Sequence, residues 1–144
     1  ENRRRMIEEC PDVYFEITPT VSIMNVYHLP DFHKEWIDKG LLEPQNVRMN
    51  ILTYPTEYRI QIIPPKERKK FVDKYEKHIK WIGDNFGDGA AKRGFESVLD
   101  FLQQENYENL VPDFIDRNTP LDKLRGESLY QVAPELEFFR DYEY

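Results

Sequence analysis

The proline pair Pro64-Pro65 separates two parts of the chain that have different residue patterns. Before it lie short runs rich in β-branched and aromatic residues, which are typical of strands. After it, apolar residues recur at the spacing of one face of an amphipathic helix. The order of these patterns predicts one domain, with strands in residues 1–65 and a helical C-terminal extension in residues 66–144. The strand candidates are 13–17, 21–26, 47–52 and 58–63.

A helix is expected between the strands at 21–26 and 47–52. Pro30 and Asp31 suit its first turn, because proline is tolerated there and a carboxylate is favoured at the positive end of the helix dipole. Gly40 is a suitable C-terminal stop. Residues 21–26 carry no charge, as in a strand buried on both faces of a parallel sheet. Strand, helix and strand in succession predict an α/β fold, here a partial, half-barrel-like parallel sheet.

Further helices are expected on either side of this unit. Residues 1–9 should be helical up to Pro11, because proline disfavours helix in the residue before it. Residues 66–82 carry an apolar stripe and should form a helix that ends in a glycine-rich turn at 83–89. Thr119-Pro120 resembles an N-cap followed by proline at the first helical position, so a short helix should begin there. The remaining helical segments are expected near 95–102, 107–115 and 134–139.

So small a parallel sheet would leave an open edge and an uncovered face, which proteins normally protect. The cover could be the C-terminal helices, a second copy of the chain, or an N-terminal half that precedes Glu1. The sequence does not begin with methionine, which favours a preceding segment. We therefore expect a homodimer or a missing N-terminal half as the partner.

The chain has one cysteine, Cys10, which excludes an internal disulfide and fits a reducing compartment. A cysteine-bound zinc or iron–sulfur site needs several thiolates, so one chain cannot supply it. No apolar run approaches the roughly 20 residues that a membrane-spanning helix needs, and no secretory signal is visible. These features predict a cytoplasmic protein without a membrane partner.

The net charge of −7 argues against general nucleic-acid binding, which requires a basic surface. The segment 66–82 is an exception, because its seven lysines and arginines outnumber its three acidic residues. The same segment contains the aromatic residues Phe71, Tyr75 and Trp81. A solvated helix face and a nucleic-acid contact with base stacking are the two interpretations of this segment.

The segment 28–33 brings together two histidines, His28 and His33, and the carboxylate of Asp31, which could be read as a metal site. Residues five apart on a helix differ in direction by roughly 140°, so these two side chains would not share a face. The segment also lacks the spacing of a zinc-protease motif. No Gly-x-Ser-x-Gly elbow or phosphate-binding glycine loop occurs in the chain. No catalytic residue or metal ligand is therefore assigned.

Ser22 and Asn25 lie near the predicted carboxyl end of a strand. In α/β sheets and barrels, ligands bind at this end of the strands. Short polar side chains there also cap the backbone, which is the alternative interpretation. Pro19 is unfavourable inside a strand, because it donates no hydrogen bond to a neighbouring strand.

Three segments together resemble the twitch group of radical S-adenosylmethionine proteins. The first, Pro19-Thr20-Val21-Ser22-Ile23-Met24-Asn25-Val26-Tyr27-His28-Leu29-Pro30, is similar to a late strand and the helix after it. The second runs from Asn50-Ile51-Leu52-Thr53-Tyr54-Pro55 to Ile63-Pro64-Pro65. The third, Leu121-Asp122-Lys123-Leu124-Arg125-Gly126 with Pro134-Glu135-Leu136, is similar to the "D-x-x-R … P-E-L" ending.

The resemblance implies a family that binds a [4Fe–4S] cluster through a C-x-x-x-C-x-x-C loop, together with S-adenosylmethionine. It implies that Thr20, Ser22 and Asn25 would lie near the cosubstrate in a complete protein, and that Asp122 and Arg125 form a structural ion pair. The cysteine loop and the glycine-rich segment are absent from this chain. The chain is therefore expected to be a C-terminal portion that is catalytically incomplete alone. A non-catalytic binding or dimerisation module, or a nucleic-acid contact through helix 66–82, is the alternative.

Overall fold

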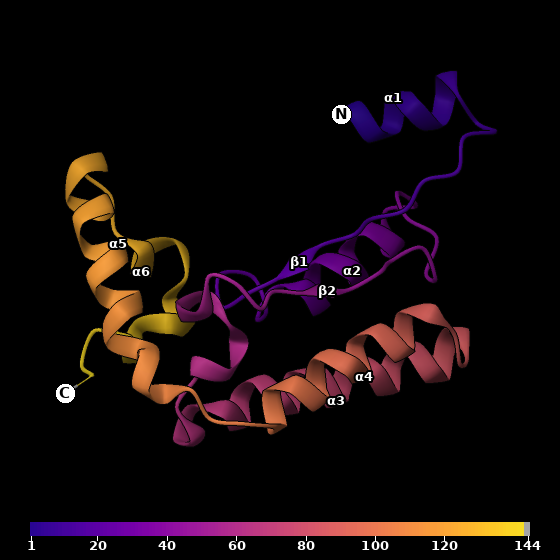
Figure 1. The fold of residues 1–144 in the computed structure, drawn as a ribbon. Helices are drawn as coiled ribbons and strands as arrows, with labels where there is room; N and C mark the ends of the chain where they lie inside the picture. Colours follow the sequence, from indigo (N-terminus) through magenta and orange to yellow (C-terminus); the bar gives the residue numbers. More distant parts are fainter. Residues whose placement is uncertain (143–144) are drawn as a thin grey trace.

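The computed structural model describes residues 1–142 and is mainly helical (Figure 1). Helices account for 62% of these described residues and strands for 4%. The only sheet in this described part has two short parallel strands, β1 (Thr20–Val21) and β2 (Asn50–Ile51). The predicted α/β fold with a half-barrel-like sheet is therefore wrong.

The strand–helix–strand unit nevertheless occurs in its smallest form. Helix α2 (Leu29–Asp38) connects β1 to β2, and Thr20 pairs with Asn50 in the parallel register. The chain turns at Gly40, which has a φ of +67°, a conformation that favours glycine. The helix predicted between the two strands, with its glycine stop, is confirmed.

Pro19 is one reason why the strands are so short. The Asn50 N–H donates to the Pro19 carbonyl over 3.0 Å, so the Pro19 backbone faces β2. Proline has no N–H to return to that strand, and the ladder is interrupted at this residue. Beyond it, pairing resumes only as an isolated bridge between Ile17 and Val47.

The predicted strand at 58–63 is also wrong. This segment forms two 3₁₀ turns, η1 (Thr56–Tyr58) and η2 (Ile60–Ile62). Its N–H groups bond locally, and Ile62 donates to the Arg59 carbonyl over 3.3 Å. A continuous buried run has no period that separates a strand from a helical turn, so its β-branched composition was misleading.

The helical part contains a long hairpin and a separate C-terminal group (Figure 1). Helices α3 (Pro65–Phe86) and α4 (Ala90–Gln103) form the hairpin, which confirms the helix predicted at 66–82. Helix α5 continues through Pro120 to Arg125, so no new helix begins at Thr119. The C-terminal group consists of η3 (Glu108–Leu110), α5 (Val111–Arg125), α6 (Leu129–Val132) and η4 (Pro134–Phe139).

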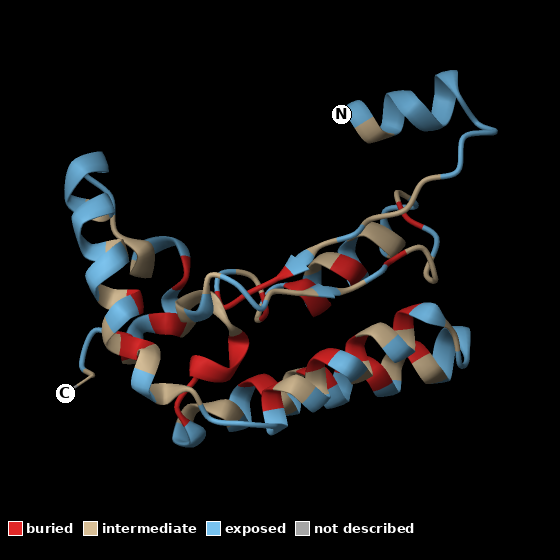
Figure 2. Ribbon diagram, viewed as in Figure 1, coloured by how far each residue is buried: buried red, intermediate tan, exposed pale blue. Residues whose placement is uncertain are grey.

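The core lies where the sheet, the hairpin and the C-terminal group meet (Figure 2). Val21 from β1 and Phe71, Tyr75 and Phe95 from the hairpin are fully buried there. The Tyr75 hydroxyl donates to the Val26 carbonyl over 2.7 Å and so links the hairpin to the turn after β1.

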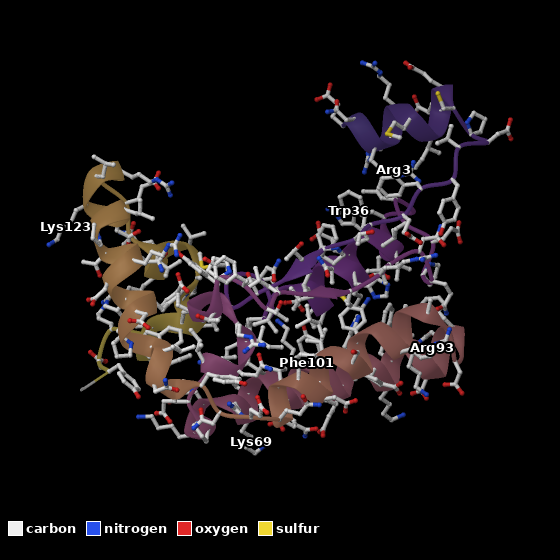
Figure 3. The ribbon with its side chains drawn as sticks, in the orientation of Figure 1. Arg3, Trp36, Lys69, Arg93, Phe101 and Lys123 are labelled. Atoms are coloured by element: carbon white, nitrogen blue, oxygen red, sulfur yellow. The ribbon has the colours of Figure 1, made fainter. Side chains whose placement is uncertain are left out.

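Helix α1 (Asn2–Glu9) lies off one end of the sheet and has no buried residue (Figure 2). Figure 3 shows Arg3 on α1 near Trp36 of α2, at the junction with the rest of the molecule. The Arg3 guanidinium lies 3.8 Å from the centre of the Phe15 ring, and its Nε donates to the Leu41 carbonyl over 2.8 Å. The helix predicted before Pro11 is confirmed, and these contacts of one side chain hold it.

Candidate functional site

The two faces of the β1–β2 pair differ in polarity. Successive side chains in a strand point to opposite faces. Val21 and Val47 are buried against the helices, whereas Thr18, Thr20 and Asn50 are exposed. A parallel sheet is normally covered on both faces, so an exposed polar face is unusual.

This exposed face carries its own polar contacts. Arg48 Nε lies 2.9 Å from Glu16 Oε2, and Asn50 Nδ2 lies 3.5 Å from Thr20 Oγ1. Arg48 keeps 72% of its side-chain surface exposed, and so it remains accessible to a ligand or a partner. The face thus offers hydroxyl, amide and guanidinium groups at the surface of two strands.

The outer edge of β1 is unpaired. The carbonyls of Ile17, Pro19 and Val21 accept hydrogen bonds from the β2 segment, so the residues between them direct their backbone groups away from β2. Those residues are Thr18 and Thr20. Within residues 1–142, no group accepts a hydrogen bond from either N–H, and only the Thr20 carbonyl has a partner, Asn25 Nδ2 at 2.9 Å.

The three predicted ligand-facing residues are brought together after β1. Asn25 Oδ1 accepts from the Ser22 N–H over 3.0 Å, while Asn25 Nδ2 donates to the Thr20 carbonyl. Ser22 Oγ accepts from the Met24 N–H over 3.2 Å. The turn therefore uses the Asn25 side chain for its own backbone, as strand-end capping requires. The Thr20 and Ser22 hydroxyl groups retain hydrogen-bonding capacity.

His28 and His33 occupy different environments. His28 Nε2 lies 2.7 Å from Glu135 Oε1, without the alignment of a hydrogen bond, and so brings η4 close to the start of α2. His33 is buried, and its Nδ1 lies 2.9 Å from His78 Nε2 on α3. Within residues 1–142, no three histidine, cysteine or acidic side chains converge as metal ligands would.

The His33–His78 pair is part of the core. His33 Nε2 lies 2.9 Å from the Pro44 carbonyl, which can only accept a hydrogen bond, so Nε2 carries the proton. His33 Nδ1 is then the acceptor, and His78 Nε2 donates to it. Desolvation by burial lowers the pKa of His33, and burial beside the His33 imidazole lowers the pKa of His78 to about 3. Both rings are therefore neutral at physiological pH.

Most cationic groups on α3 are already engaged. Arg68 donates from Nε to the Ile63 carbonyl and from Nη2 to the Gln61 carbonyl, each over 2.9 Å. Lys69 pairs with Asp73 over 2.5 Å, and three further lysines on this helix have carboxylate partners. A helix whose charges are mostly paired presents little net positive potential to a polyanion. The other pairs are Lys70–Glu67, Lys74–Asp31 and Lys80–Asp84.

Two other predicted residues have simple roles. Asp122 Oδ2 accepts a hydrogen bond from the Leu129 N–H over 2.8 Å and so holds the start of α6, instead of pairing with Arg125. Cys10 is an exposed free thiol at the end of α1. Among the described residues, no helix combines the length and the apolar character that crossing a bilayer requires.

Two of these features could not be predicted from the sequence. The open edge at Thr18 depends on which backbone groups face β2, and that direction follows from the register, not from residue type. The contact between His33 and His78 joins residues that are 45 positions apart. The helical stripe of α3 predicts that His78 faces inward, but nothing local identifies its partner.

Comparison of the chain with protein-family models, curated proteins and solved structures gives no match. The resemblance to radical S-adenosylmethionine proteins therefore stays a prediction that rests on the three quoted segments.

Proposed function

We propose that this chain is a catalytically incomplete binding module that is completed by a β-strand from another polypeptide at the outer edge of β1. The unpaired N–H groups of Thr18 and Thr20 carry this proposal. Exposed edges of this kind pair with an added strand, whose main chain supplies the hydrogen bonds and whose alternate side chains provide specificity.

The position of Pro19 supports this role. Its ring nitrogen faces β2, so the missing donor weakens the existing pair and leaves the outer edge intact. The donors on the outer side come from Thr18 and Thr20, which are both exposed. An added strand would therefore find regularly spaced donors beside the polar face that contains Asn50 and Arg48.

The family resemblance suggests the identity of the partner. We infer a polypeptide that carries the cysteine loop of a radical S-adenosylmethionine protein, because this chain has a single cysteine. In the assembled protein, Thr20, Ser22 and Asn25 would lie beside the cosubstrate, at the carboxyl end of β1. Alone, the chain supplies a binding surface and no redox centre.

The test compares two substitutions at one position. Both substitutions remove the Thr20 hydroxyl group. Thr20→Pro also removes the outward backbone N–H, whereas Thr20→Val keeps it. A cluster-bearing N-terminal half of a twitch-type radical S-adenosylmethionine protein is supplied separately, and binding is measured by calorimetry. We expect Thr20→Pro to weaken binding by about tenfold relative to Thr20→Val, since a lost backbone hydrogen bond costs about 1 kcal/mol or more.

The other outcomes test strand addition at the β1 edge and the identity of the partner separately. Equal binding by Thr20→Pro and Thr20→Val would disprove strand addition at this edge. If no variant binds the cluster-bearing half, the inferred family is wrong. Sedimentation of the chain alone then tests the homodimer, in which β1 pairs with β1 of a second copy. Self-association that Thr20→Pro abolishes would identify the second copy as the strand donor.

A further inference from the structure

A groove between α2 and α3 lies apart from the β1 edge. Its lining comes from Pro30, Asp31 and Lys34 on α2, and from one face of α3. Its volume of about 340 Å³ falls within the roughly 300–1,000 Å³ of small-molecule sites. The α3 residues are spaced three or four apart, so they share one stripe of the helix. They are Lys74, Lys77, His78 and Trp81.

One ring nitrogen of the buried residue His78, which lines the groove, has no hydrogen-bond partner among the described residues. His78 is 7% exposed, and the proton on His33 Nε2 fixes the direction of the hydrogen bond between the two imidazoles. His78 Nε2 is therefore the donor, and its Nδ1 is an acceptor. Within residues 1–142, no protein group forms a hydrogen bond with that Nδ1. A ligand in the groove could donate an N–H or O–H to it.

The charged groups of the groove favour an anion. Three lysines face one carboxylate, Asp31, which pairs with Lys74. Lys34 also pairs with Asp38 outside the groove, whereas Lys77 has no ion pair among the described residues. A lysine ammonium is a mobile point charge that can follow a phosphate or carboxylate.

The other residues that line the groove favour a ligand with a flat ring system. Trp81 is half-buried and stacks on the His78 ring at an interplanar angle of 26°. Lys34 Nζ lies 5.0 Å from the centre of the Trp81 ring, at a position that a flat group could take while the ammonium turns to the anion. Pro30 contributes an apolar wall.

We propose that the groove between α2 and α3 binds a small planar anion that carries its own hydrogen-bond donor, of the class of nucleoside monophosphates. Lys77, which has no ion pair among the described residues, binds the anionic group beside Lys34 and Lys74, Trp81 packs against the planar body, and His78 Nδ1 accepts from the donor. The site is independent of the proposed strand addition, because it lies on the helical side of the molecule.

The test uses the chain alone with adenosine monophosphate, adenosine and inorganic phosphate as probes. Binding is followed by the NMR signal of the Trp81 indole N–H, in a Trp36→Phe background that leaves one tryptophan. We expect adenosine monophosphate to bind at least tenfold more tightly than either of its parts. Lys77→Gln should weaken this binding about fivefold, as the loss of one partly exposed charge contact.

Lys66→Gln is the matched control, because Lys66 lies on the same helix, outside the groove and without an ion pair among the described residues. It should leave the affinity unchanged. The proposal is overturned if the Trp81 signal does not move at millimolar adenosine monophosphate. It is also overturned if Lys66→Gln weakens binding as much as Lys77→Gln, or if inorganic phosphate binds equally well, since either result indicates only general charge attraction.

Discussion

The helical hairpin and the β1 edge satisfy their backbone groups in different ways. Helices α3 and α4 bond their own N–H and carbonyl groups, and Gly87, with a φ of +74°, ends α3. The β1 segment pairs with a strand on one side only, and the N–H groups of Thr18 and Thr20 on the other side have no acceptor within residues 1–142. A helix satisfies its backbone within one chain segment, whereas a strand with a single neighbour leaves one edge for water or another strand. The β1 edge is therefore the place where the proposed partner strand would add.

The two sides also differ in packing. The hairpin buries Phe95 against Tyr75 and His78, with ring centres 5.7 Å and 4.5 Å apart. On the sheet side, Tyr14 and Tyr54 are 69% and 83% exposed. We therefore expect the free energy of folding to come mainly from the hairpin and its contacts with β1.

The largest expected effect tests this difference in packing. Phe95→Ala should destabilise the protein by about 3–5 kcal/mol, because it removes a fully buried ring and leaves a cavity. Tyr54→Ala, at an exposed aromatic residue outside the hairpin, should stay within about 0.5 kcal/mol of the wild type. Both values come from urea unfolding followed by circular dichroism. Similar losses in the two variants would show that the hairpin does not dominate stability.

A smaller effect should appear as acid sensitivity of the hairpin. The pKa of His78 is lowered to about 3 by burial, so an unfolded chain takes up this proton below its ordinary pKa of 6.5 while the folded chain does not. Stability is complete above pH 6.5 and is lost as the pH falls toward 3. At pH 5 the loss from this group is about 2 kcal/mol.

The measurement is the urea midpoint between pH 7.5 and 4.5 for the wild type and for His78→Gln, which cannot titrate. His78→Gln should be less stable at neutral pH and should show a flatter pH dependence. His33, Asp31, Lys34 and Lys74 surround the imidazole of His78 and are present in both proteins, so the difference between the two profiles reports His78. Parallel pH profiles for the two proteins would show that protonation of His78 does not control acid stability.

The smallest expected effect concerns helix α1, which lies off one end of the sheet. Arg3 holds α1 through Phe15 and Leu41, and no residue of this helix is buried. Arg3→Ala should therefore free α1 while changing global stability by less than about 1 kcal/mol. Limited proteolysis and amide exchange of residues 2–9 report the release. Arg4→Ala removes an exposed guanidinium from the same helix and should have no effect on either measurement.

Several elements could be predicted from the sequence because their causes are local. Pro30 and Gly40 mark the ends of α2, and the apolar stripe after Pro65 specifies α3. The prediction at Thr119-Pro120 was wrong, because the rest of α5 continues the helix across a proline that local rules treat as a start. The strand prediction at 58–63 was wrong for a different reason, since strands require a partner and this segment packs its isoleucines into the core as 3₁₀ turns instead.

The candidate sites also differ in how far they could be predicted from the sequence. Ser22 and Asn25 could be selected in the sequence as short polar residues near a strand end, Thr20 was indicated by the family resemblance, and the turn brings the three together. The free N–H groups at the β1 edge and the groove around His78 could not, because both arise from contacts between segments.

The sequence by itself determined helix α2 with both of its ends, the start of α3, the lack of thiols for an iron–sulfur cluster, and the polar residues after β1. These depend on spacing and composition within a few turns of chain. Only the tertiary structure decided how little sheet forms, which edge of it stays open, and how the two buried histidines meet. Pairing and burial depend on residues far apart in the chain, so no local pattern records them.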